Sequence, residues 1–173
     1  MKTLIALLLT SLPAVALAQY SNPDKSFYDH AAQGGRVEVA AGKLAQRNAA
    51  SQAVKDFGAM MVEDHAASNK KLKKLAESKS VKLPEGPSLT QKAKLKMLEL
   101  KTGSSFDKDY IEGQVKAHKE TLELLKKEID SGKDADAKAF ASEILPTVEA
   151  HLAKIKQIAA DSGVKIADSG EKR

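Results

Sequence analysis

Apolar and small residues recur along most of the chain at alternating steps of three and four, the spacing that places them on one face of an α-helix. Four long segments show this pattern, and short turn signals separate them. The expected helices span about residues 24–48, 51–80, 104–132 and 134–161, and Ser104 or Ser105 is expected to cap the third. A shorter helix is expected over residues 89–100.

The linker after the second long segment interrupts the helical pattern. Its sequence VKLPEGPSLT contains Pro84, Gly86 and Pro87, which cannot all lie inside a helix. Strand signals are nearly absent from the whole chain. The pattern therefore predicts an all-α protein, most simply a four-helix bundle with an extra short helix between the second and third long helices. The linker is long enough either to form a turn or to cross over along the bundle.

One titratable residue interrupts the apolar stripe of each long helix. These residues are Glu38, His65, His118 and His151. At a rise of about 1.5 Å per residue they lie roughly 17–28 Å from the nearest turn, near mid-height of helices about 40 Å long. The sequence thus predicts that the four side chains, each from a different helix, converge inside the bundle.

Two interpretations of this cluster remain open. The four side chains could satisfy one another as a buried polar network that fixes helix register. Alternatively, three neutral imidazoles and one carboxylate could bind a divalent transition metal, with zinc, copper and iron as candidates. Asp64 and Glu63 are then candidates for orienting an imidazole through a hydrogen bond, and the alternative is that both are surface or helix-flank charges. His30 lies just off the first stripe and is expected to be exposed.

The first 18 residues have the features of a secretory signal peptide. Lys2 supplies a basic start, residues 4–12 are apolar, and Ala16-Leu17-Ala18 is an A-x-A cleavage site. The expected organisation is a signal peptide over residues 1–18, a bundle domain over residues 19–163 and a polar tail over residues 164–173. The protein is therefore expected to be exported, most simply to a bacterial periplasm, without stable insertion in the membrane after cleavage.

Composition narrows the chemistry further. The chain has no cysteine, which excludes disulfides, thiol catalysis and thiolate metal sites. The net charge of +5 comes from intermixed acidic and basic residues, which is typical of solvated helix faces. A basic cluster of Lys70, Lys71, Lys73 and Lys74 suggests weak contact with an anionic envelope surface. Few aromatic or arginine residues accompany it, so a nucleic-acid partner is not expected.

Several stretches together resemble a bacterial family. They are residues 27–65, FDKDYIEGQVKAH at residues 106–118 and FASEILPTVEAHL at residues 140–152. They are similar to exported proteins of unknown function, often labelled "predicted outer membrane protein", and the resemblance implies a ferritin-like four-helix bundle. The Glu-x-x-His motifs of di-iron bundles are missing, because Val62, Val115 and Val148 stand three residues before the histidines.

Three functional hypotheses follow. The first is a non-enzymatic exported bundle with a role in envelope maintenance or stress survival. The second is a metal-binding or metal-buffering protein that uses the Glu/His cluster. The third is a small metal-dependent oxidoreductase built on the same residues, which would need a redox metal and an open coordination position.

Overall fold

The computed structural model describes residues 22–166, and within them five α-helices and no β-strand are found. The helices are α1 (Asn22–Asn48), α2 (Gln52–Ser78), α3 (Leu89–Glu99), α4 (Gly103–Ser131) and α5 (Ala135–Asp161). This confirms the predicted all-α class, a ferritin-like four-helix bundle with an extra short helix in the linker. The predicted signal peptide lies outside the described residues, as does the tail beyond Ile166.

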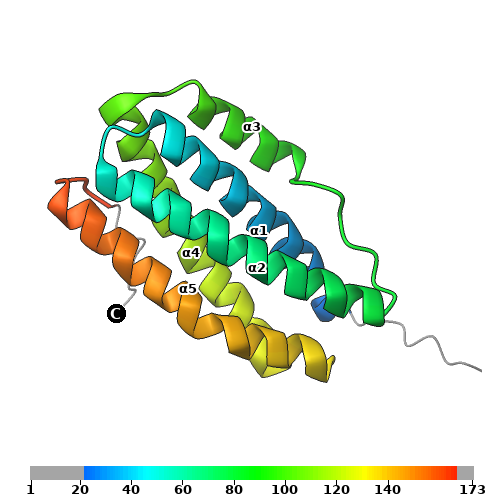
Figure 1. The fold of residues 1–173 in the computed structure, drawn as a ribbon. Helices are drawn as coiled ribbons and strands as arrows, with labels where there is room; N and C mark the ends of the chain where they lie inside the picture. The colour runs from blue at the N-terminus through cyan, green and yellow to red at the C-terminus, as the bar shows by residue number, and fades with distance from the viewer. Residues whose placement is uncertain (1–21, 167–173) are drawn as a thin grey trace, which may run out of the picture.

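The linker between α2 and α4 is a crossover that runs the length of the bundle (Figure 1). From the end of α2 the chain returns along α1 through α3, so that α4 begins beside the α1–α2 turn. Ala49 forms an isolated bridge with Gly103, and the Ser51 amide donates to the Asp107 carboxylate at 2.8 Å. Therefore α2 and α4 run parallel, which decides between the two linker geometries that the sequence left open.

The start of α4 differs from the sequence prediction. Thr102, rather than Ser104 or Ser105, is its N-cap residue, and the helix begins at Gly103 with a φ of 65°. Because glycine adopts a positive φ without a Cβ clash, the chain can turn into the helix earlier than the serines suggest.

Two glycines let α1 and α2 approach each other closely. A Cβ atom at Gly58 would lie 2.6 Å from the Cβ of Ala45 and 2.8 Å from the carbonyl oxygen of Gly42. A Cβ atom at Gly42 would lie 2.5 Å from the carbonyl oxygen of Gly58. The helix backbones themselves are in contact here, so any larger residue would force them apart.

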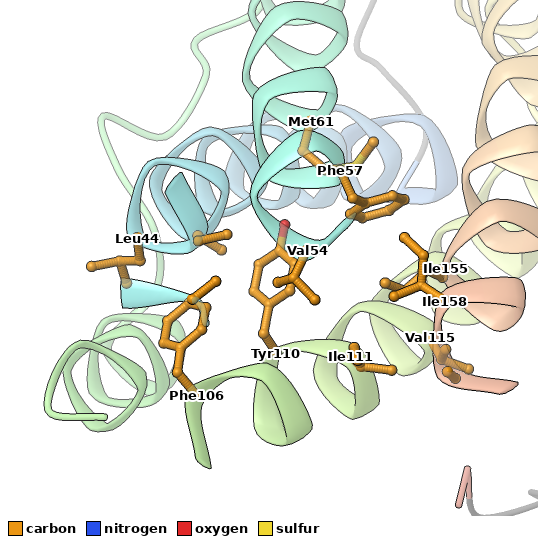
Figure 2. Packing of buried hydrophobic residues seen from close by; sticks show 14 residues of the cluster. Leu44, Val54, Phe57, Met61, Phe106, Tyr110, Ile111, Val115, Ile155 and Ile158 are labelled. Atoms are coloured by element: carbon orange, nitrogen blue, oxygen red, sulfur yellow. The ribbon is translucent and has the colours of Figure 1, made fainter. Parts of the chain in front are cut away.

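The predicted stripes form the core. Stripe residues such as Phe27, Met61, Ile111 and Ile155 are buried, and the apolar stripe residues join two buried clusters, one toward each end of the bundle. Figure 2 shows the cluster near the α1–α2 turn, where Phe57 and Tyr110 lie between Leu44 and the isoleucines of α5. Val164 and Ile166 pack against this cluster, so the packing continues past Gly163. No helix in residues 22–166 has the length and hydropathy that a membrane span requires.

A second polar group is buried at the opposite end of the bundle, and the stripes did not predict it. Asp24 is 1% exposed and Glu128 is 3% exposed. Tyr28 donates to Asp134 at 2.9 Å, and Lys79 bonds the same carboxylate at 3.0 Å. The pKa of Glu128 is raised to about 7, mainly by burial and to a lesser extent by the nearby Asp24 carboxylate.

This cluster makes stability depend on pH. With its raised pKa, Glu128 stabilises the folded chain below about pH 4.5, and this contribution is lost as the pH rises through about 7. We expect Glu128→Gln to remove about 1–2 kcal/mol of the wild-type stability difference between pH 5 and pH 8, allowing for solvent screening. Urea unfolding at both pH values measures this. Glu123→Gln, on the exposed face of α4, is the control and should keep the wild-type difference in stability between the two pH values. If Glu128→Gln keeps this difference as well, Glu128 is not the group that makes stability depend on pH.

Candidate metal centre

Three histidines from three helices meet in the middle of the bundle. Each of His65 on α2, His118 on α4 and His151 on α5 offers one ring nitrogen, and these nitrogens all lie within 4.8 Å of one another. The ring centroids are 5.5–6.0 Å apart. His118 and His151 are 2% and 3% exposed, while His65 is half-buried. We call these three residues the histidine triad.

Hydrogen bonds fix two of the rings and leave one nitrogen of each free. His118 Nδ1 lies 2.9 Å from the Gln114 carbonyl oxygen and donates to it. His151 Nε2 donates to the Asp64 carboxylate at 2.8 Å. The second nitrogen of each ring, His118 Nε2 and His151 Nδ1, then carries a lone pair, and each is buried without a hydrogen-bond partner.

His65, the third member of the triad, also has a ring nitrogen without a partner. Its Nε2 is buried and has no hydrogen-bond partner. Burial lowers the pKa of His65 to about 3, and the two neighbouring imidazoles lower it as well. Burial also lowers the pKa of His151, although Asp64 opposes this effect. Both rings are therefore neutral at pH 7, which is the form that binds metal.

Glu38 lies beside the triad and is not part of it. Gln114 Nε2 donates to Glu38 Oε2 at 2.7 Å, and burial raises the pKa of this carboxyl group. Among the described residues, the side chains that share ligand atoms within 4.8 Å are the three histidines. The hydroxyl of Tyr110 is buried near Glu38 without a hydrogen-bond partner, and burial raises its pKa well above the ordinary value.

A cavity of about 230 Å³ borders the triad. His65 and His151 line it together with Glu38 and Asp64. Apolar side chains form much of the remaining wall, among them Leu72, Leu125, Phe140, Ile144 and Val148. A ligand atom could therefore approach two of the histidines from this side without displacing a helix.

Phe57, which belongs to the core cluster near the α1–α2 turn, packs against the triad. Its ring centroid is 6.2 Å from that of His118 and 6.4 Å from that of His151, both in edge-on arrangements. It is 2% exposed. This ring keeps one side of the triad free of water and restricts how far the imidazoles can rotate.

Other residues singled out by the sequence lie away from the triad. His30 is exposed, and its Nδ1 lies 2.7 Å from the carbonyl oxygen of Ser26. It lines the cavity but does not belong to the histidine triad. In the basic cluster, Lys71 pairs with Glu143 at 2.5 Å and Lys73 with Glu77 at 3.7 Å. The other two lysines of that cluster are exposed.

Sequence reasoning missed Gln114, which holds both Glu38 and the His118 ring. A signal for it was present, because Gln114 lies four residues before His118 and three after Ile111, on the same face of α4. It was overlooked because Val115, its neighbour, continues the apolar stripe.

Comparison with known proteins agrees with the fold. A solved crystal structure described as a "putative secreted protein DUF305 from Streptomyces coelicolor" aligns with a TM-score of 0.71 at 13% identity. The alignment covers 84% of this chain and 96% of the other. No curated protein matches the chain significantly. The family model described as "Domain of unknown function (DUF4142)" matches residues 9–158, and the chain belongs to this family.

Proposed function

We propose that the protein binds one transition-metal ion through His65, His118 and His151. The observation that carries this proposal is that each ring keeps a buried nitrogen without a hydrogen-bond partner. An unsatisfied buried polar atom costs about 1–3 kcal/mol, so one such atom on each of three rings that meet in the bundle would be a large penalty for a merely structural cluster. A metal ion would satisfy all three.

The geometry suits a metal with only small adjustments. Zinc binds histidine nitrogen at about 2.0–2.1 Å, so three nitrogens in a tetrahedral site lie about 3.3 Å apart. The triad nitrogens lie within 4.8 Å. We expect changes in side-chain torsions to close this gap when a metal binds.

Nitrogen donors favour zinc and copper over magnesium or calcium, which prefer oxygen. The Irving–Williams order puts copper(II) above zinc in affinity for such a site. Glu38, the fourth predicted ligand, is held by Gln114, so water from the cavity would complete the coordination. Iron in a di-iron centre is disfavoured because residues 62, 115 and 148 are valines.

At the level of the cell, we infer a metal-binding or metal-buffering protein exported to the envelope, where it contributes to envelope maintenance or stress survival. The predicted signal peptide supports export. The cavity beside the triad also supports a second candidate, a metal-dependent oxidoreductase, because it leaves one coordination position open to a small molecule.

Thermal melting tests the proposal. The chain is purified without a metal-affinity column and stripped with a chelator, and equal excesses of zinc, copper or magnesium are then added. A ligand that binds only the folded state raises the melting temperature. We expect zinc and copper to raise it and magnesium to leave it unchanged; a melting temperature that none of them changes would exclude the metal site.

Asp64 provides a further prediction, because it holds the ring of His151 from behind. Removing such an outer partner typically costs 10–100-fold in metal affinity, so we expect Asp64→Asn to weaken zinc binding by about that factor. Competition with a chromophoric chelator measures it. The matched control is Glu63→Gln, which changes the adjacent exposed carboxylate. Equal affinities for the two variants would show that Asp64 does not orient a ligand.

A further inference from the structure

The short helix α3 exposes an apolar surface that the bundle does not use. Among the described residues, the large apolar side chains that are exposed are Leu89, Met97 and Leu100, with 84%, 63% and 70% of their surface accessible. All three lie on α3 or at its end, and α3 has no buried residue. Large apolar side chains gathered on one exposed element commonly mark an interaction site.

These side chains form one stripe. Together with Ala93 they are spaced by four, four and three residues, which places them on a single face of the helix. The opposite face carries Leu95 and Leu98, which pack against the core cluster. α3 contacts α1 and α4 (Figure 1). The apolar stripe therefore points away from the bundle.

Lysines border the stripe on both sides. Lys92 and Lys94 are exposed, and neither forms an ion pair with any residue that the structure describes. Lys96 pairs with Glu99 at 2.9 Å. The surface thus combines exposed apolar side chains with unpaired cations, which is the combination that an interfacial helix presents to an anionic membrane.

We propose that α3 docks onto the surface of an anionic phospholipid bilayer, with Leu89, Met97 and Leu100 entering the headgroup region and Lys92 and Lys94 contacting lipid phosphates. Charge argues for this occupant over a second copy of the chain. Two α3 helices packed face to face would bring their lysines together, whereas anionic headgroups would neutralise them. The lysine stems can also lie along the apolar stripe while the ammonium groups reach the phosphates.

A fluorophore on α3 tests this docking locally. Because the chain has no cysteine, Ala93→Cys gives a unique site for a polarity-sensitive dye in the middle of the stripe. Ala150→Cys, exposed on α5, is the matched control, since α5 does not belong to the α3 surface. Both full-length chains carry the same N-terminal segment, so any contribution of residues 1–21 to membrane binding is equal in the two.

The labelled chains are titrated with phosphatidylglycerol vesicles and with phosphatidylcholine vesicles. We expect a blue shift and a rise in emission at position 93 with phosphatidylglycerol, and no change at position 150 or with phosphatidylcholine. Equal responses at both positions, or none at position 93, would overturn the proposal. A blue shift at position 93 that grows with protein concentration without vesicles would show a second copy of the chain as the occupant, which also overturns it.

Substitutions separate the apolar contribution from general charge. In the Ala93→Cys background, replacing Leu89, Met97 and Leu100 by glutamine should weaken the apparent vesicle affinity by about tenfold or more, and these exposed changes leave the core intact. The control variant Lys154→Gln with Lys156→Gln, at two exposed lysines of α5, should keep the wild-type affinity. If the control weakens binding as much as the α3 variant does, the docking surface is not α3.

Discussion

Replacing His118 by leucine should abolish tight metal binding without destabilising the metal-free protein. His118 is the most buried member of the triad, and its Nδ1 bond to the Gln114 carbonyl leaves Nε2 buried without a hydrogen-bond partner. Structural zinc sites bind with about 10–16 kcal/mol at pH 7, so losing one of three protein ligands should cost on the order of a thousandfold in affinity. Isothermal titration of the metal-free protein with zinc measures this loss.

The stability of the same variant separates the two interpretations of the cluster. A leucine of similar volume removes a buried nitrogen that has no partner together with the Nδ1 bond to the Gln114 carbonyl, so the two effects oppose each other and the free energy of unfolding without metal should stay close to that of the wild type. If the histidines were only a polar network that holds the helices in register, the change should destabilise the fold. His30→Leu, at the exposed histidine, is the control and should change neither quantity. A large loss of metal-free stability in His118→Leu would favour the structural network.

Replacing Phe57 by alanine should produce the largest loss of stability. The side chain is 2% exposed and packs against Tyr110, His118 and His151. Truncating a buried phenylalanine typically costs about 3–5 kcal/mol, because burial is lost and a cavity remains. Urea unfolding of the metal-free protein measures it.

The same variant should also weaken metal binding, because the imidazoles lose the ring that restricts their rotation. Leu89→Ala, at a side chain that is 84% exposed, is the control and should change stability by less than about 0.5 kcal/mol. A Phe57→Ala protein as stable as this control would mean that the core beneath the triad is not packed as described.

The fold was largely predictable from the sequence because the apolar spacing is regular. The stripes identified which face of each long helix is buried, and counting residues from the turns placed His65, His118 and His151 at one depth. Imidazoles on an apolar face are informative, since a buried polar group must find a partner. The meeting of the three histidines follows from this reasoning, whereas Asp64 was only a candidate for orienting an imidazole, and its contact with His151 comes from the structure.

Other features depend on tertiary contacts that spacing does not encode. Counting residues from a turn places a side chain along the bundle axis only to within about one helical turn. Gln114 lies one turn before His118 on α4, and it is Gln114 rather than a histidine that bonds Glu38. The direction of the linker between α2 and α4 depends on how α3 packs against α1, and the linker sequence allowed both geometries. The close approach of the α1 and α2 backbones at Gly42 and Gly58 could not be predicted from the sequence, because neither glycine breaks the helical pattern.

The buried carboxyl groups at the far end of the bundle show the same limit. Asp24 and Glu128 are charged residues that a sequence pattern assigns to solvent. The structure buries both, because the start of α1 packs against the α4–α5 turn, where the Lys133 amide donates to Asp24 at 2.7 Å. Such burial is set by residues more than a hundred positions apart.

X-ray absorption at the zinc edge of the loaded protein is the most direct test of the metal site. The account predicts one zinc per chain, bound by three imidazole rings through nitrogens at about 2.0–2.1 Å and by one oxygen from water, with the outer-shell scattering of the imidazole rings visible in the spectrum. In His118→Leu the three-imidazole signature should disappear. A spectrum without imidazole scattering, or one that is the same in wild type and His118→Leu, would contradict the assignment of the histidine triad as the metal centre.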